Sequence, residues 1–124
     1  MGFKHVGVWK LSGDKILYNL ELCSDLKNVL YAFICDRSVL YIGKTSQQLK
    51  KRMYGYQNPG PTQSTNIKGN SLIRELVTSG KEVEIHALPD NGMLYYGGFH
   101  VNLAAGLEDS IVSTIKPPWN KMGI

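Results

Sequence analysis

Five side chains spread along this sequence are of types that could act together on a phosphodiester. Tyr31 and Tyr41 lie in two short apolar segments, Arg52 follows in a basic segment, and Glu108 and Asn120 come far downstream. Water that attacks a phosphodiester adds charge to a group that is already an anion. A carboxylate that holds a divalent cation and a guanidinium that binds phosphate oxygens would offset that charge. The order and spacing of these residues indicate metal-assisted phosphodiester cleavage.

The composition permits a polyanionic partner without requiring one. The chain has 124 residues, enough for one domain with a buried core, and 14 Lys and Arg against 10 Asp and Glu give a net charge of +4. No apolar run approaches the roughly 18 residues of a membrane span, and we expect no membrane association or secretory signal. Cys23 and Cys35 belong to no Cys-x-x-Cys or Cys/His cluster. We therefore expect reduced thiols, no zinc site and a cytoplasmic location.

Two β-hairpins are predicted in the first third of the chain. The first joins residues 5–11 to 16–22 around a Ser12-Gly13-Asp14 turn and carries no obvious chemistry, so we expect it to extend the sheet or to make contacts. The second joins residues 29–35 to 39–42 around a three-residue loop, Asp36-Arg37-Ser38.

The register of the second hairpin places the two tyrosines on one face. With a three-residue loop, Cys35 opposes Val39, and the residue numbers of every pair add up to 74. Odd-numbered residues of both strands then share a face, which carries Tyr31, Phe33 and Tyr41. The other face is apolar and is the expected core face, with Leu30, Ala32, Ile34, Leu40 and Ile42. Tyr31 and Tyr41 become diagonal neighbours within reach of one small ligand. By themselves they could equally be an aromatic pair packed on a half-buried face.

A basic helix is predicted after this hairpin. Gly43 ends the strand and is expected to be structural at the site, and Thr45 with Gln48 matches a capping box for a helix over residues 46–56. Arg52 should project from the edge of its buried stripe.

The rest of the chain predicts a small α+β domain. The elements expected are an ordered loop over 57–70, a helix over 71–79 stopped by Gly80, a strand over 82–88, a second excursion over 89–102 and a helix over 103–116 ended by Pro117-Pro118. Together with the two hairpins they predict a mainly antiparallel sheet with helices packed against it.

The residues resemble the GIY-YIG nuclease family over residues 28–121. Val29-Leu30-Tyr31 corresponds to the first triplet, with Val in place of Gly, and Tyr41-Ile42-Gly43 is the second triplet intact. The continuation Lys44-Thr45 and the ending Lys116-Pro117-Pro118-Trp119-Asn120 are most similar to small phage members, with restriction-enzyme members next. The resemblance implies a GIY-YIG-like domain over residues 28–124, preceded by a β-hairpin extension over residues 1–27.

The resemblance also implies an activity and a role for each residue. The family is Mg²⁺-dependent, with Mn²⁺ as a substitute, and cleaves DNA by a single-metal mechanism to 5′-phosphate and 3′-hydroxyl ends. Glu108 falls on its metal-binding glutamate, Arg52 on its catalytic arginine and Asn120 on its C-terminal asparagine. Tyr31 is the implied general base, and Tyr41 would orient the water or the phosphate. Which tyrosine takes the proton stays open, as does a phage, restriction or repair role.

Double-stranded DNA is the expected partner. Five further basic side chains are candidates for backbone contacts, each of which could equally be an ordinary solvated charge: Lys44, Lys50, Lys51, Lys68 and Arg74. Cutting both strands with one site per chain favours a homo-oligomer, a dimer or a tetramer. The alternative is a non-catalytic nucleic-acid-binding module on the same fold. All five positions to which the resemblance assigns chemistry carry the expected residue, and this favours the enzyme over the binding module.

Overall fold

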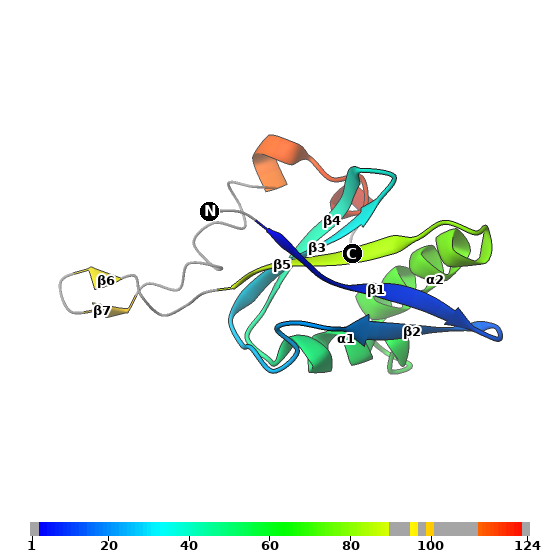
Figure 1. Cartoon of the computed structure of the whole chain (residues 1–124), viewed down its shortest axis with the longest axis horizontal. Helices are drawn as coiled ribbons and strands as arrows, with labels where there is room; N and C mark the ends of the chain where they lie inside the picture. The colour runs from blue at the N-terminus through cyan, green and yellow to red at the C-terminus, as the bar shows by residue number, and fades with distance from the viewer. Residues whose placement is uncertain (1–2, 90–94, 97–98, 101–111, 123–124) are drawn as a thin grey trace.

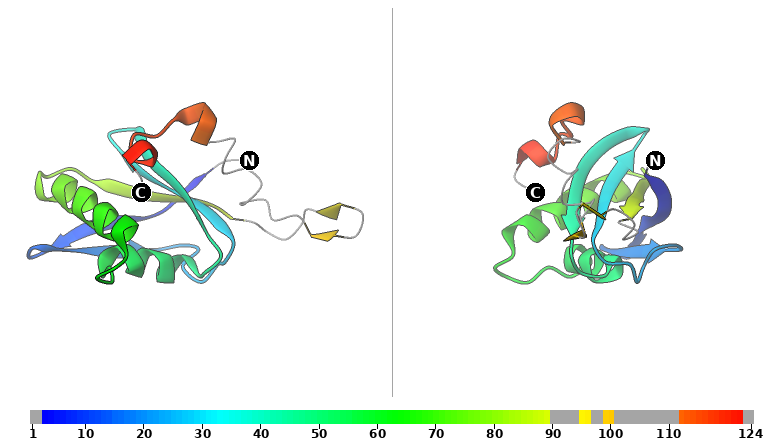
Figure 2. Two further views of the ribbon diagram at one scale, coloured as in Figure 1. Left: turned by 180° about the vertical axis from the view of Figure 1, so that it is seen from behind. Right: turned by 90° about the vertical axis from the view of Figure 1, so that its left-hand side faces the viewer.

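Five antiparallel strands form the main sheet in the computed structural model, which describes residues 3–89, 95–96, 99–100 and 112–122. Their order is β2-β1-β5-β3-β4, and α1 and α2 lie on one side of the sheet (Figure 1, Figure 2). The elements are β1 (Lys4–Ser12), β2 (Lys15–Leu20), β3 (Val29–Cys35), β4 (Ser38–Thr45), α1 (Leu49–Gln57), α2 (Ser64–Thr78), β5 (Val83–Pro89), β6 (Tyr95–Tyr96), β7 (Phe99–His100) and the 3-10 turn η1 (Asn120–Met122). The predicted α+β class is confirmed.

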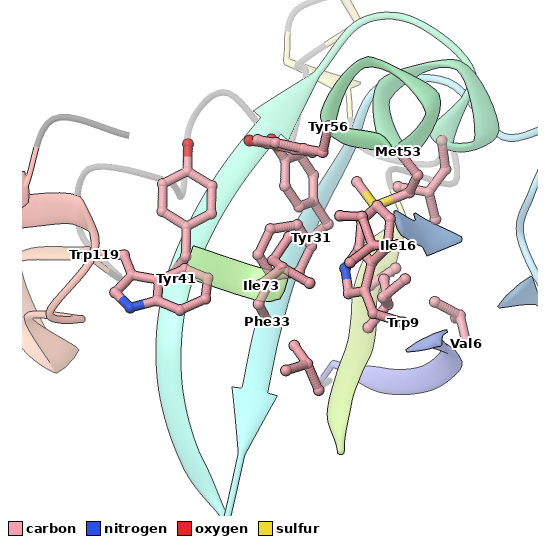
Figure 3. Close-up of a cluster of buried hydrophobic side chains, with 14 of the residues drawn as sticks. Val6, Trp9, Ile16, Tyr31, Phe33, Tyr41, Met53, Tyr56, Ile73 and Trp119 are labelled. Carbon is pink, nitrogen blue, oxygen red and sulfur yellow. The ribbon is translucent and has the colours of Figure 1, made fainter. Parts of the chain in front are cut away.

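The N-terminal hairpin extends the sheet, as predicted. β1 pairs with β2 on one side and with β5 on the other, so the hairpin joins the sheet through β5. Val6, Trp9 and Ile16 from this hairpin are buried in the same cluster as the core residues of β3, β5 and both helices (Figure 3). β1 and β2 therefore share one sheet with β3, β4 and β5 and one core with β3, β5 and both helices.

The second hairpin turns through two residues instead of the three that were predicted. Asp36 and Arg37 both have a positive φ, 51° and 64°, and Cys35 pairs directly with Ser38. Two consecutive positive φ values are typical of the type I′ turn, whose twist matches that of the flanking strands. The three-residue loop was wrong because this turn type is usually recognised by Asn-Gly or Asp-Gly, and the turn here is Asp36-Arg37.

A β-bulge then restores the predicted register. Ile34 pairs with Val39, but Phe33 pairs with Tyr41, and the shift falls between Phe33 and Ile34. The extra residue in β4 is Leu40, which takes up the position that the shorter turn released. Beyond the bulge, paired positions sum to 74, as the sequence predicted. The prediction of which side chains share a face is therefore correct, although the predicted turn was wrong.

The main core lies on the aromatic face of this hairpin, which corrects the expectation that the opposite face would form it. Tyr31 and Phe33 are completely buried and Tyr41 is 7% exposed, and all three belong to the cluster that also contains buried residues of α1 and α2. The opposite face is also covered, since Leu30 and Ile42 are buried there. β3 lies between β5 and β4, and strands inside a sheet can be buried on both faces. Alternation along β3 therefore could not reveal which face packs against α1 and α2.

The α1 helix begins three residues later than predicted. β4 continues past Gly43 to Thr45, and the Thr45 hydroxyl accepts a hydrogen bond from the backbone N–H of Gln47 at 3.0 Å, which is a local turn and not a helix cap. No side chain caps α1. Instead the Leu49 N–H donates to the Leu26 carbonyl at 2.9 Å. The capping box was wrong because the linker between β2 and β3 supplies backbone carbonyls near this helix end.

The α2 helix is nearly twice as long as predicted. It begins at Ser64, inside the segment 57–70 that was expected to be a loop. Asn66, Gly69 and Ile73 are its buried residues, at a spacing that places them on one helical face. Because the first two are polar or small, a search for apolar periodicity does not detect them.

The predicted end of α2 and the strand that follows are confirmed. Gly80 has a φ of 89° after the helix, and Val83, Ile85 and Ala87 of β5 are buried on alternate positions. Within the predicted excursion 89–102, β6 pairs with β7 in a separate two-stranded sheet. Residues 112–115 are helical, Lys116 lies outside the helix with a φ of 54°, and residues 103–111 of the predicted helix lie outside the described residues.

Both cysteines, which lie in the described part of the chain, are free thiols, as predicted. Among the described residues there is no helix with the length and apolar character needed to cross a membrane.

The turn geometry generates a first prediction. Arg37→Gly should raise the free energy of unfolding by about 0.5–1 kcal/mol, because glycine adopts a positive φ without the steric cost that arginine incurs. Urea unfolding followed by circular dichroism measures this change. Ser38→Gly, one residue further along and inside the strand, should lower stability instead. A loss of stability in both variants would contradict the type I′ assignment.

Candidate active site

Gly43 allows the two tyrosines of the predicted site to lie side by side. The rings of Tyr31 and Tyr41 have centroids 6.0 Å apart, which confirms that they are diagonal neighbours. Gly43 is paired with Tyr31 across the hairpin, and a Cβ at Gly43 would lie 2.6 Å from the Tyr31 hydroxyl oxygen and 2.8 Å from Cε2 of Tyr41. Real Cβ atoms do not approach other atoms so closely. The last residue of the second triplet must therefore be glycine for the two rings to take these positions.

The guanidinium of Arg52 is held on three sides. Its Nε donates to the Tyr31 hydroxyl at 3.1 Å, Nη2 donates to the Tyr56 hydroxyl at 2.8 Å, and Nη1 donates to Oδ1 of Asn66 at 2.8 Å. The two phenol hydroxyls are themselves hydrogen-bonded at 2.8 Å. The guanidinium carbon also lies 4.2 Å from the centroid of the Tyr56 ring. Arg52 is thus fixed by β3, by its own helix and by α2.

Two of the five N–H groups of this guanidinium have no partner in the described part of the chain. A guanidinium carries five donors, one on Nε and two on each terminal nitrogen, and the three bonds above use one on each nitrogen. One N–H therefore remains on each of Nη1 and Nη2. Two neighbouring charged donors suit two oxygens of a phosphate or a carboxylate.

Arg52 lies at a surface hollow whose charged lining residues are all positive. The hollow has a volume of about 640 Å³. Its lining residues are Lys44, Thr45, Ser46, Gln47, Lys51, Arg52, Tyr54, Gly55, Asn58, Gly60, Gln63 and Asn66. No carboxylate belongs to this described lining, so Lys44, Lys51 and Arg52 create a local positive potential. Such a hollow attracts an anion.

The buried phenols Tyr31 and Tyr56 hold their protons more tightly than free phenols. Burial is the main cause that raises the pKa of Tyr31, and the neighbouring Tyr41 adds to it, while Arg52 acts in the opposite direction. Burial likewise raises the pKa of Tyr56. A phenol that acts as a general base near neutral pH would instead need nearby cations to lower its pKa. The direction is reversed because the loss of water around a fully buried phenol outweighs the attraction of one guanidinium.

Tyr41 differs from these two phenols. No hydrogen bond joins its hydroxyl to another residue of the described chain, and its ring is slightly exposed, at 7%. In Figure 3 its hydroxyl points toward the same end of the aromatic cluster as the Tyr56 hydroxyl. Of the two tyrosines in the predicted triplets, Tyr41 is the one with an uncommitted hydroxyl.

Asn120 binds the backbone of β4. Its Oδ1 accepts from the Ile42 N–H and its Nδ2 donates to the Ile42 carbonyl, both at 2.9 Å. The adjacent Trp119 N–H donates to the Leu40 carbonyl, also at 2.9 Å. The amide of Asn120 is thus committed to the strand that carries the second triplet, so it positions that strand in this structure.

The five candidate DNA contacts separate into two groups. Lys44 and Lys51 line the positive hollow. The others lie elsewhere: Lys50 pairs with Asp25 at 2.8 Å, and Lys68 is exposed on α2. Arg74 lines a different hollow, beside Asp14 and Glu75. The hollow beside Arg52 therefore brings together only two of the five.

Glu108 lies outside the described residues, so its predicted place beside Arg52 stays a prediction. The described residues contain no group of three or more His, Cys, Asp or Glu side chains that could hold a metal ion.

Two residues of the arrangement were missed from the sequence. Tyr56 follows Arg52 by four residues, and this spacing puts the two side chains on one helical face. Asn66 lies seven residues before the buried Ile73, and that spacing also repeats along one face. Both patterns were available, but an aromatic residue near a helix end and an amide in a polar segment are too common to be noticed alone.

No protein-family model and no curated protein matches the sequence. Two solved structures share its fold. A mutant of EndoII from bacteriophage T4 superposes with a TM-score of 0.73 at 24% identity, over 95% of this chain and 90% of that chain. The restriction endonuclease HPY188I, in complex with product DNA, superposes with a TM-score of 0.56 at 16% identity, over 90% of this chain and 72% of that chain. The resemblance stated from the triplets, with phage members first, is confirmed at the level of the fold.

The close approach at Gly43 generates a prediction about stability. Gly43→Ala should lower the free energy of unfolding by about 1–3 kcal/mol, because the new methyl group overlaps two buried rings that cannot move apart freely. Gly60→Ala is the comparison, since the three atoms nearest to its Cβ all belong to the exposed side chain of Gln63, at 3.2–3.5 Å. Urea unfolding of both variants provides the comparison. Equal stability of Gly43→Ala and the wild type would show that the rings do not need this glycine.

The raised pKa values of Tyr31 and Tyr56 predict alkaline destabilisation. Below about pH 10 the phenols are protonated in both the folded and the unfolded chain, so their contribution to stability is complete. Above it the unfolded chain loses these protons first, and stability should fall by up to about 1.4 kcal/mol per pH unit for each phenol. Urea unfolding between about pH 9 and pH 11 measures the slope, and Tyr31→Phe should reduce it. Ultraviolet titration in which all seven tyrosines of the still-folded protein ionise together would contradict the prediction.

Proposed function

We propose that this protein is a Mg²⁺-dependent DNA endonuclease that hydrolyses phosphodiester bonds to 5′-phosphate and 3′-hydroxyl ends. The observation that carries the proposal is the guanidinium of Arg52, anchored by Tyr31, Tyr56 and Asn66 at a positive hollow, with two N–H groups left for an anion. A preorganised cation at the reacting phosphate stabilises the charge that develops there. Removal of one such group typically costs roughly 3 kcal/mol of activation free energy.

The fold supports the same class of substrate. HPY188I is a restriction endonuclease whose structure contains product DNA, and the second structural neighbour is the phage protein EndoII. Both structures share the fold of this chain. We extend the substrate class, DNA, from HPY188I to this chain as part of the proposal.

Arg52, Lys44 and Lys51 would bind the phosphodiester. All three line the hollow, and none of the described lining residues is acidic, so the backbone of DNA meets no like charge there. These contacts set affinity and register without reading sequence.

Glu108 is the residue that we propose holds the metal ion. Mg²⁺ retains several waters and needs few protein ligands, so one carboxylate together with the substrate phosphate is a suitable donor set. The absence of a carboxylate from the described lining of the hollow agrees with a ligand from a different segment. When bound, the cation would polarise a phosphoryl oxygen and neutralise charge at the reacting phosphorus.

Tyr41 is the tyrosine that we propose meets the attacking water. Its hydroxyl has no partner in the described chain, whereas Tyr31 is fully buried, bound to Arg52 and held protonated by a raised pKa. In this arrangement Tyr31 acts through Arg52, as a positioning residue. The general base suggested for Tyr31 by the resemblance would need the phenol to become exposed when DNA binds.

The second candidate function is a nucleic-acid-binding module without catalysis. The positive hollow alone would favour it, since attraction of a phosphate backbone requires no chemistry. Cleavage that depends on both Mg²⁺ and Glu108 distinguishes the enzyme from the module. We also propose that the protein acts as a homodimer or tetramer when both strands are cut, which light scattering with and without DNA tests.

The proposal predicts different losses at Glu108 and Arg52. In a plasmid-nicking assay with Mg²⁺, Glu108→Gln should abolish cleavage while gel-shift assays show retained DNA binding, because only the metal ligand is lost. Arg52→Lys should reduce cleavage by roughly 10²–10³-fold, since an ammonium cannot keep three anchors and still present two donors to phosphate.

Arg37→Lys is the matched control for Arg52→Lys. It makes the same change at an exposed position in the turn between β3 and β4, and should cleave like the wild type. Cleavage that persists in EDTA would exclude the metal. A wild-type protein that binds DNA but does not cleave it under any of several divalent ions would favour the binding module.

A further inference from the structure

Asn66 reaches Arg52 across the contact between the two helices. Asn66 is only 9% exposed, in the first turn of α2, and faces Gly55 of α1. A Cβ at Gly55 would lie 3.3 Å from Nδ2 of Asn66 and 3.5 Å from Nη1 of Arg52. A larger side chain at Gly55 would therefore occupy the space through which the amide and the guanidinium meet.

The orientation of the Asn66 amide is determined by its partners. Arg52 can only donate, so the atom that faces Nη1 must be the oxygen of Asn66. The nitrogen of the same amide then needs an acceptor, which is Oε1 of Gln63 at 3.2 Å. That oxygen also accepts from the backbone N–H of Gly60 at 2.9 Å. A chain of hydrogen bonds thus connects Gly60, Gln63, Asn66 and Arg52. Its partners leave only one assignment of the oxygen and nitrogen atoms of the Asn66 amide.

An amide at this position orients the guanidinium and leaves its charge uncompensated. Tyr31 and Tyr56 hold Nε and Nη2, and among the described residues Asn66 is the one that holds Nη1. A carboxylate would hold Nη1 equally well, but it would neutralise the cation and compete with phosphate for it. A neutral acceptor such as the Asn66 amide fixes the orientation of the Arg52 guanidinium and leaves its positive charge intact.

We propose that Asn66, supported by Gln63, is a positioning residue that orients the Arg52 guanidinium toward a phosphate oxygen of the substrate. This proposal rests on the proposed nuclease function for its substrate, but the orientation of Arg52 is a property of the protein alone. Asn66 does not touch the phosphate. It acts through Arg52 by keeping the free N–H of Nη1 in place.

Asn70 provides a matched control on the same helix. Its Nδ2 donates to the Tyr56 carbonyl at 2.8 Å and to the Gln57 carbonyl at 3.3 Å, so it also ties α2 to α1 through an amide. It makes no contact with the guanidinium among the described bonds. Loss of Asn70 should therefore affect the stability of the helix pair and not the orientation of Arg52.

The first test is kinetic. Asn66→Ala should lower kcat for plasmid nicking by about 10- to 100-fold with a small change in KM, because the charge stays and its direction is lost. Asn66→Asp should lower kcat and also raise KM, because the new carboxylate cancels the charge. Asn70→Ala should show wild-type kcat at a temperature where it is folded. Equal kcat values for Asn66→Ala and Asn70→Ala, or wild-type kinetics of Asn66→Asp, would overturn the proposal.

The second test does not depend on activity. In the wild type, nuclear magnetic resonance of the Arg52 side chain should show separate Nη–H signals, because anchored terminal nitrogens rotate slowly. Those signals should merge in Asn66→Ala and remain separate in Asn70→Ala. Unchanged signals in Asn66→Ala would refute the positioning role. If the signals merge in Asn66→Ala but the wild type never cleaves DNA, the positioning role would be supported and the nuclease function would be rejected.

Discussion

A half-buried guanidinium is the constraint around which this structure is organised. A charge removed from water is costly unless its donors find partners, and each nitrogen of the Arg52 guanidinium has one, supplied by two phenols and an amide from three different elements. The partners come together only because two positions lack a side chain. Gly43 leaves room for the tyrosine rings, and Gly55 leaves room for Asn66. The helix pair and the central hairpin thus both position one cation, and its remaining donors lie at a hollow whose described lining residues carry no negative charge.

The fold was largely predictable because its main signals are local. The residue patterns of β3, β4 and β5 predicted the strands. The predicted pairing, in which the two residue numbers add up to 74, assigned the side chains of the hairpin to the correct faces of the sheet, even though the turn was assigned wrongly. The turn and the bulge compensate for each other, and neither leaves a strong mark on the sequence, since Asp36 and Arg37 adopt positive φ values without glycine. The first half of α2 was not predictable in the same way. Its buried face begins with Asn66 and Gly69, and Asn66 is bonded to Arg52, a partner in another helix.

The candidate site was predictable where residue types are distinctive and unpredictable where geometry decides. Tyr31, Tyr41 and Arg52 were found through the triplets, and the structure brings them together. The pKa direction of Tyr31 was not found, because it depends on complete burial beneath α1, which the strand pattern does not specify. The sequence also could not predict which of the lysines lie at the hollow. Lys50 and Lys51 are neighbours, yet the first pairs with Asp25 and the second lines the hollow, since adjacent positions on a helix point in different directions.

The edge of the sheet explains why an asparagine follows the tryptophan near the C-terminus. β4 is an edge strand, so the N–H and carbonyl of Ile42 would face outward without a partner. The Asn120 amide offers one acceptor and one donor at the spacing of a neighbouring strand, and it satisfies both groups. Ile42 lies between Tyr41 and Gly43, so a clasp on its backbone also holds the two residues that set the tyrosine geometry. An asparagine that the resemblance assigns to the site can thus support the proposed chemistry without contacting substrate, by closing the strand that carries Tyr41.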